Sequence, residues 1–196
     1  PLNSPRQKSE RTLGILCILC AAFCFSLMSL FVRLAGNIPT MQKIFFRNLV
    51  AAIAAFVILA REGQGFRIHK GCLGGHLARS ITGMLGMGAA YTFVRQMSRK
   101  GERGPEIVMF FSAFTCVCAI PFFAFNFQPM SAKQWLFLLL AGCAAAGGQL
   151  SITAAYRHAP AKEISVFDYS QIVYAALWGF LVFGEIPDAL SFVGYA

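Results

Sequence analysis

The sequence predicts an all-α, polytopic membrane protein, and its composition and its long apolar runs are the observations that predict it. The chain has 196 residues, of which 57% are hydrophobic and only 13% are charged, whereas a soluble domain is about a quarter charged. Each run is close to the roughly 20 residues that a helix needs to cross a hydrocarbon core of about 30 Å. Because lipid offers the backbone no hydrogen bonds, these runs should be helices.

The formal net charge is +9. In a soluble protein such a charge would suggest binding to nucleic acid. Here the basic residues lie between the apolar runs, where membrane topology and contact with anionic lipid headgroups explain them better. We therefore expect the lipid bilayer, and not nucleic acid, to be the large partner.

Six spans are expected along the chain, at about residues 13–35, 41–60, 71–94, 107–125, 134–156 and 163–184. Residues 1–12 form a basic tail, which should be cytoplasmic, and the run that follows is too long for a signal-peptide core. The first run is therefore expected to stay as a transmembrane helix in the plasma or inner membrane. Pro121 lies near the end of the fourth span and predicts a kink or a terminus there.

The sixth span carries one acid, Asp168, within its apolar stretch. Helical spacing places this acid on one face with Gln171, Ala175 and Gly179, and places four apolar residues on the opposite face: Val166, Val173, Leu177 and Phe180. An acid inside a span costs several kcal/mol, so it should face protein or water and mark a pathway. The alternative is an aspartate that only bonds a neighbouring helix.

The fifth span is rich in small residues. The pairs Ala144/Gly148 and Gly147/Ser151 have the spacing that lets two helices approach closely. A second stripe on this span comprises Gly142, Ala146, Gln149, Thr153 and Tyr156. This stripe is compatible with a cavity lining and equally with tight helix packing.

Seven cysteines are present, nearly all inside apolar runs. Cys17, Cys20 and Cys24 have a spacing that resembles a metal site, but no histidine or second cysteine pair accompanies them. We expect them to be small packing residues, with no metal, no other cofactor and no disulfide framework.

An internal repeat is visible between the first third and the middle of the chain. Phe31-Val32-Arg33, a proline at 39 and Phe45-Phe46 recur as Phe93-Val94-Arg95, Pro105 and Phe110-Phe111. The order is kept with small offsets, which suggests two related halves of the kind that many transporters have.

The basic loops conflict with six crossings. The tail and the loop at 61–70 should lie on the same side, but the next basic loop, 95–103, then falls on the opposite side. The conflict disappears if an odd number of membrane crossings is missing near residues 83–88. The third span would then join two helices that were once separate. If the two loops lie on one side, the third span does not cross.

These motifs make the chain resemble the drug/metabolite transporter superfamily, in its EamA-like branch. The first block contains Phe-Val-Arg, Pro39, the FFRN of residues 45–48 and Arg79-Ser80. The second contains Gln149, the Ala154-Ala155-Tyr156 run, the turn that includes Ala159 and Pro160, and the closing Gly184-Glu185 before Pro187.

The resemblance implies ten helices in two inverted five-helix halves. By that pattern residues 13–86 are the remnant of a first EamA-like repeat, and residues 87–196 are a second repeat, truncated in its last helix. Helices 4 and 5, with the first half's own Gly-Glu, would be missing, as would most of helix 10. The function implied is a secondary carrier of small organic metabolites that works by alternating access, with an incomplete or inactive fragment as one possibility.

The substrate path expected from this resemblance combines three groups of residues. Asp168, Gln171 and Tyr174 come from the sixth span, and Gln149, Thr153 and Tyr156 come from the fifth. Arg47 and Arg79 would offset an acid or hold an anionic group, although Arg47 is equally compatible with reaching out to the membrane surface. For His76 a packing role is expected, and for Glu185 a structural one.

The sequence also bears on two other classes of function. An intramembrane aspartyl protease needs two acids within spans, and only Asp168 is available. Ser151 and His158 lack a nucleophile turn, and no zinc or nucleotide motif appears, so no enzyme activity is expected. A membrane scaffold or helper protein without transport activity is the alternative, and a homodimer is compatible with either.

Overall fold

The computed structural model describes residues 5–63, 71–85 and 87–185, and this part of the chain is helical with short turns. Its elements are α1 (Pro5–Leu34), α2 (Thr40–Arg61), α3 (Leu73–Leu85), α4 (Met87–Arg99), α5 (Gly104–Phe125), α6 (Ala132–His158), α7 (Ala161–Ile164), the 3₁₀ segment η1 (Ser165–Tyr169) and α8 (Ser170–Phe183). The predicted all-α class is confirmed.

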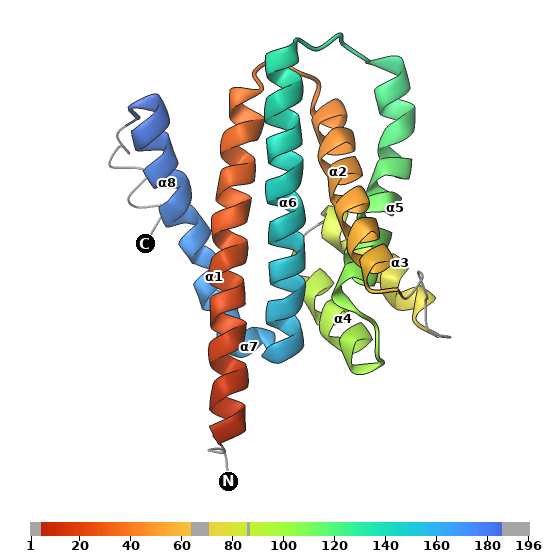
Figure 1. Cartoon of the computed structure of the whole chain (residues 1–196), viewed down its shortest axis with the longest axis vertical. Helices are drawn as coiled ribbons and strands as arrows, with labels where there is room; N and C mark the ends of the chain where they lie inside the picture. The colour runs from red at the N-terminus through yellow and green to blue at the C-terminus, as the bar shows by residue number, and fades with distance from the viewer. Residues whose placement is uncertain (1–4, 64–70, 86, 186–196) are drawn as a thin grey trace.

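Five helical segments of the described chain are long and apolar enough to cross a membrane. They are Ser9–Leu34, Thr40–Arg61, Gly104–Phe125, Ala132–His158 and Lys162–Phe183. The last of these joins α7, η1 and α8 into one rod (Figure 1). The chain is thus a multi-pass helical membrane protein, as its composition predicts.

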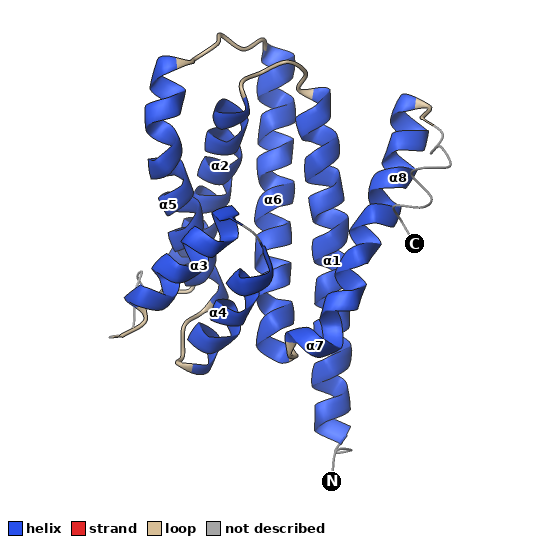
Figure 2. Ribbon diagram, turned by 180° about the vertical axis from the view of Figure 1, so that it is seen from behind, coloured by secondary structure: helices blue, strands red, loops and turns tan. Residues whose placement is uncertain are grey.

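The long helices form a layer in which each packs on its neighbour. α6 packs against both α1 and α2, and α2 packs against α5. α8 stands at the edge of this layer and leans on α1, as Figures 1 and 2 show from opposite sides. The small residues of α6 explain the close contact with α1, because a Cβ added at Gly148 would lie 2.8 Å from the Phe25 ring.

The third expected span does not cross, and the prediction of a crossing over residues 71–94 is wrong. α3 ends at Leu85 and α4 begins at Met87, and the two helices pack against each other. Each has 13 residues, which at about 1.5 Å per residue is about 20 Å, too short for the hydrocarbon core. We call this pair the hairpin. Its break lies within residues 83–88, the region in which the pattern of basic loops predicts missing crossings.

Polar contacts at the base of the hairpin show that it returns to the side from which it starts. Arg103, which precedes α5, donates from Nη1 to Glu62 Oε2 at 3.0 Å, and Glu62 follows α2. His76 Nε2, near the start of α3, lies 3.4 Å from Glu102 Oε2, just after α4. Residues 61–63, the described start of the first basic loop, and the loop at 95–103 therefore lie at the same end.

The hairpin removes the topology conflict. The N-terminus, the bases of α3 and α4, and the α6–α7 turn lie at one end of the molecule in Figure 1, which we call the basic end. By the bounds of these helices, the described basic residues at this end include Arg11, Arg61, Arg99, Lys100, Arg157 and Lys162. The α1–α2 and α5–α6 connections lie at the opposite end.

Candidate functional site

The rod at 162–183 carries the acid that the sequence singled out. η1 interrupts its α-helical path at Ser165–Tyr169, so Asp168 lies in a 3₁₀ turn directly before α8. Short 3₁₀ stretches within a helix often mark a functional hinge. Of the predicted polar face, Asp168, Gln171 and Ala175 line one cavity, whereas Gly179 lies near Glu185, since a Cβ added there would be 3.7 Å from the Glu185 Oε2. The four apolar residues of the opposite face are exposed: Val166, Val173, Leu177 and Phe180.

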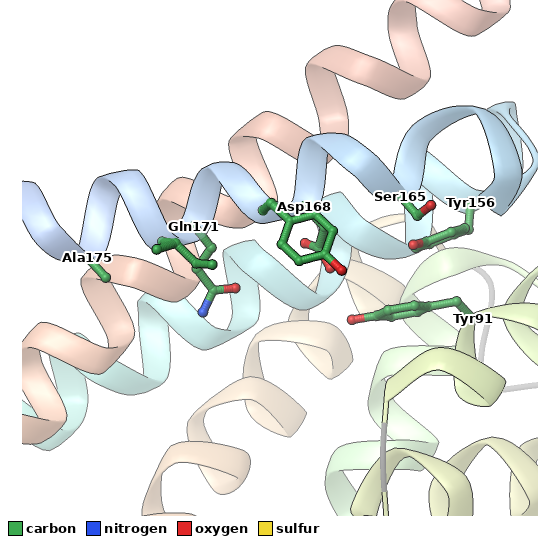
Figure 3. A pocket seen from close by; sticks show the side chains of 8 residues that line it. Tyr91, Tyr156, Ser165, Asp168, Gln171 and Ala175 are labelled. Carbon is green, nitrogen blue, oxygen red and sulfur yellow. The ribbon is translucent and has the colours of Figure 1, made fainter. Parts of the chain in front are cut away.

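A cavity of about 450 Å³ lies between this rod and the facing helices α4 and α6. It is lined by Tyr91, Tyr156, Ser165, Asp168, Tyr169, Gln171, Ile172 and Ala175. Figure 3 shows Asp168 and Gln171 on the rod, with Tyr91 across the space from them. This volume falls within the range of small-molecule sites.

Two stacked tyrosines form the wall opposite the acid. The rings of Tyr91 (α4) and Tyr156 (α6) lie 4.4 Å apart between centroids at 13°, and both side chains are buried. Stacked rings of this kind offer a flat apolar surface with polar hydroxyl groups at its edge. Tyr91 interacts electrostatically with Asp168, with Tyr156 and with the Arg79 guanidinium.

The Asp168 carboxylate supplies the negative charge of the cavity. Its Oδ1 is buried and finds no hydrogen-bond partner among the described residues. A buried carboxylate oxygen without a donor is costly, so a ligand group or water that donates to it would be stabilised. The site can therefore hold a cationic or hydrogen-bond-donating group beside an apolar, ring-stacking body.

Three of the predicted path residues, Asp168, Gln171 and Tyr156, line the cavity. Tyr174 instead turns toward α1, where its ring meets Phe23 edge-on at 5.5 Å. Arg47 lies on α2, and its Nη1 points at the Met28 sulfur at 3.4 Å. The sequence suggested both side chains for the path, but it could not show which neighbour each side chain meets.

The other predicted path residues lie deeper in the bundle, behind Tyr91. Arg79 is 3% exposed; its Nη2 donates to Gln149 Oε1 at 3.1 Å, and its guanidinium lies 4.4 Å above the Phe111 ring. Thr153 is fully buried. Of the α6 stripe, only Tyr156 lines the cavity, whereas Gly142 meets Val50 of α2.

The family-motif residues at the two ends of the rod are structural contacts. Ala159 caps α6 and packs on α1, where a Cβ added at Gly14 would lie 2.9 Å from the Ala159 Cβ. Pro160 precedes α7 at the same turn. Gly184 ends α8 with φ at +65°, a left-handed conformation that favours glycine.

Glu185 pairs with Arg33 at the end opposite to the basic one. Arg33 Nη1 donates to Glu185 Oε2 at 2.7 Å, Nη2 donates to the other carboxylate oxygen, and the guanidinium lies 4.0 Å over the Phe183 ring. Hydrogen bonding from Arg33 lowers the pKa of the Glu185 carboxyl below its ordinary value. We call this set the latch, since it fastens the end of α8 to the end of α1, as the structural role expected for Glu185 requires.

Sequence reasoning missed Tyr91, Ser165 and Tyr169 as cavity residues. No sequence signal showed that the hairpin would carry Tyr91 to Asp168. In the part of the chain that the structure describes, no group of three or more His, Cys, Asp or Glu side chains could hold a metal ion. The cavity is therefore described by its organic side chains alone.

Comparison with protein families gives one match, in which residues 75–196 match the EamA-like transporter family. This range covers the hairpin, the cavity and the latch residue Glu185. It begins before residue 87, so the boundary between the two expected repeats stays a prediction.

Among curated proteins, this chain is similar to the pseudopaline exporter CntI of Pseudomonas aeruginosa, with 36% identity over 102 residues, which cover 52% of this chain and 36% of the exporter. It is also similar to a riboflavin transporter of Vibrio cholerae, with 27% identity over 180 residues, 85% of this chain and 55% of that protein. The chain thus spans between about a third and about half the length of these relatives. No solved structure matches it.

Proposed function

This chain belongs to the EamA-like transporter family, and we propose that it carries a small organic molecule across the plasma or inner membrane through the Asp168 cavity. The observation that carries this proposal is the cavity of about 450 Å³, which sets a carboxylate oxygen without a partner in the described chain against two stacked tyrosines. An acid kept within a spanning segment is costly unless it serves a pathway.

The chemistry of the lining selects a class of substrate. Asp168 attracts a cationic or hydrogen-bond-donating group, Gln171 offers both donor and acceptor atoms, and the Tyr91–Tyr156 stack suits a flat, partly apolar body. The relatives named as a pseudopaline exporter and a riboflavin transporter are carriers of organic molecules. The proposed substrate is therefore a small organic metabolite with a donor group and a planar or apolar portion.

Alternating access would come from movement of the rod. Among the described elements, the α8 helix packs on α1 and on η1, and the 3₁₀ turn at Asp168 gives it a natural hinge. The latch holds its far end, while Arg11 of α1 holds its basic end through Glu163 at 3.8 Å. Beside that contact, His158 Nδ1 lies 2.6 Å from Glu10 Oε2 and joins the end of α6 to α1. In the proposed cycle one set of contacts opens while the other holds, with the basic end cytoplasmic.

The test is ligand-dependent stabilisation of the purified chain in detergent, with riboflavin and a panel of cationic and neutral planar metabolites as probes. A ligand at about 100 times its Kd stabilises the folded state by about 2.7 kcal/mol, which is a shift of several degrees for a chain of this size. We expect such a shift in the wild type, its loss in Asp168→Asn, and its retention in Tyr174→Phe, whose ring lies outside the cavity.

Transport of the compound so identified is then measured in proteoliposomes. Flux that depends on Asp168 and persists in Tyr174→Phe supports a carrier. Binding without flux would favour the scaffold or helper reading. No stabilising compound, or equal shifts in wild type and Asp168→Asn, would contradict the proposal.

A further inference from the structure

Arg79 of α3 is a buried cation with an incomplete set of partners. Its side chain is 3% exposed, and a guanidinium stays charged in proteins. Nη2 donates to Gln149 Oε1 at 3.1 Å, but Nε and Nη1 are buried and find no hydrogen-bond partner among the described residues. The titratable groups of the described chain that interact with this guanidinium are His76 and Tyr91, and neither is a carboxylate. A buried charge without an opposite charge is costly.

Other arginines of the described chain show what Arg79 lacks. Arg33 and Arg103 each form an ion pair with a glutamate carboxylate. Arg95 also has a buried nitrogen that finds no hydrogen-bond partner in the described part of the chain, but it interacts electrostatically with the Glu163 carboxylate. Arg79 is thus a buried cation to which the described residues supply no carboxylate.

Arg79 lies next to the wall of the Asp168 cavity. Tyr91 lines that cavity (Figure 3) and interacts electrostatically both with Asp168 and with the Arg79 guanidinium. The cavity therefore has an anionic group on one side of this tyrosine and a cationic group behind it. A change of rotamer at one side chain, that of Tyr91, would connect the two.

A row of polar side chains on α6 continues from the cavity to the partner of Arg79. Tyr156, Thr153 and Gln149 are three and four residues apart, so they share one helix face. Tyr156 lines the cavity and Gln149 binds Arg79. Thr153, between them, is fully buried, and its hydroxyl has no hydrogen-bond partner among the described side chains and backbone. At about 1.5 Å per residue the row covers roughly 10 Å, which is the length of a small organic molecule.

We propose that Arg79 binds a carboxylate of the molecule that this chain carries, while Asp168 binds a cationic group of the same molecule. This inference rests on the proposed function and narrows it, because it makes the substrate a zwitterion with an amine at one end, a carboxylate at the other and a flat body between them. The Tyr91 side chain turns aside to admit the carboxylate, which accepts hydrogen bonds from the Arg79 guanidinium and from the Thr153 hydroxyl.

The test compares two probes of one shape, 4-(aminomethyl)benzoate and 4-(aminomethyl)benzamide, titrated calorimetrically into the purified chain in detergent. Both carry the amine and the flat ring, and only the first carries a carboxylate. We expect the benzoate to bind the wild type about tenfold more tightly than the benzamide, or better, because a guanidinium bonds a carboxylate more strongly than an amide. In Arg79→Gln the benzoate should bind no more tightly than the benzamide, since Asp168 repels a carboxylate that no cation offsets.

The ratio of the two affinities separates recognition from folding. Both values come from the same preparation, so a partly misfolded variant lowers the number of binding sites but leaves the ratio unchanged. A purely structural role of Arg79 would weaken both probes together. Arg79→Lys, which keeps a cation, should retain a preference of roughly threefold or more for the benzoate, whereas Arg47→Gln removes the other arginine expected in the path and should keep the full preference.

Asp168→Asn distinguishes failure of this inference from failure of the proposed function, because it should weaken both probes. Binding that depends on Asp168 but is equal for the two probes, or a preference for the benzoate that survives in Arg79→Gln, would overturn the inference and leave the proposed function standing. If neither probe binds the wild type, the inference also falls, and the wider panel of metabolites then decides the proposed function.

Discussion

The long helices and the hairpin of α3 and α4 are held in place in different ways. α1, α6 and α8 are held along their lengths, through glycines and alanines that let backbones approach, and α8 is fastened at one end by the exposed latch. α3 and α4 are too short to span and are held at their base, where charged side chains are buried. An apolar segment can therefore enter a membrane layer and return, provided that a polar network fixes its base.

That base is a partly buried network of charges. Glu106 and Glu102 are almost fully buried, and Arg103 Nη2 donates to Glu106 Oε1 at 2.6 Å while its backbone N–H donates to Glu106 Oε2 at 3.0 Å. Burial lowers the pKa of His76, although the neighbouring Glu102 opposes this change. The interactions with Glu106 and Glu62 raise the pKa of Arg103 above its ordinary value.

The largest effect should follow from removing the arginine of this network. Arg103→Ala takes away the cation beside a buried carboxylate, which is far more damaging than losing an exposed pair. We expect the midpoint of thermal unfolding in detergent to fall by roughly 5 to 10 °C. Arg99→Ala, an exposed arginine four residues earlier, is the matched control and should change it by less than about 2 °C. Equal shifts would show that the base does not hold the hairpin.

An intermediate effect should distinguish the tightly packed long helices from the more open hairpin. A Cβ at Gly142 of α6 would lie 2.5 Å from the Val50 Cβ, whereas one at Gly74 of α3 meets nothing within 4 Å. Gly142→Ala should therefore lower the unfolding midpoint by roughly 2 to 6 °C through overpacking. Gly74→Ala should leave it unchanged or raise it slightly, because alanine favours a helix. The opposite ranking would contradict the packing described for α6.

The smallest effect should come from the latch, which is exposed. Because the pKa of Glu185 is lowered in the folded chain, the contribution of the pair is present above the ordinary glutamate pKa and is lost as the pH falls through the lowered value. The protection factor of the amides in the last turn of α8, which corrects the exchange rate for the intrinsic effect of pH, should therefore fall at low pH and also in Arg33→Gln at neutral pH. Lys43→Gln, which alters another cation at the same end, should leave that protection factor unchanged. A low-pH fall that persists undiminished in Arg33→Gln would exclude the latch as its cause.

Much of the fold could be predicted from the sequence, because hydropathy and length fix where helices cross. The faces of the sixth span were predicted for a physical reason, since a helix that meets protein on one side and lipid on the other must show a period of about 3.6. The hairpin could not be predicted from hydropathy, which is the same for a helix that crosses and for two that turn back. Only the basic residues at 95–103 indicated that a simple crossing of the third span conflicts with the distribution of charge.

The candidate site could be predicted in part. Asp168 stood out because an acid is rare in a span, and Gln171 followed from its place on the same face. Tyr91 could not be predicted, since it reaches the cavity only through the return of α4. Arg79 and Gln149 were expected in the path because they are polar, but in the structure they bond to each other, which satisfies part of their polar groups without a ligand.

The central claim is that the Asp168 face of the rod borders an aqueous cavity while its opposite face meets lipid. In a chain freed of its native cysteines, Gln171→Cys and Val173→Cys place one thiol on each face, two residues apart. A membrane-impermeant thiol reagent applied to both sides of reconstituted vesicles should modify Gln171→Cys at least ten times faster than Val173→Cys. Equal rates, or faster modification at position 173, would contradict the account.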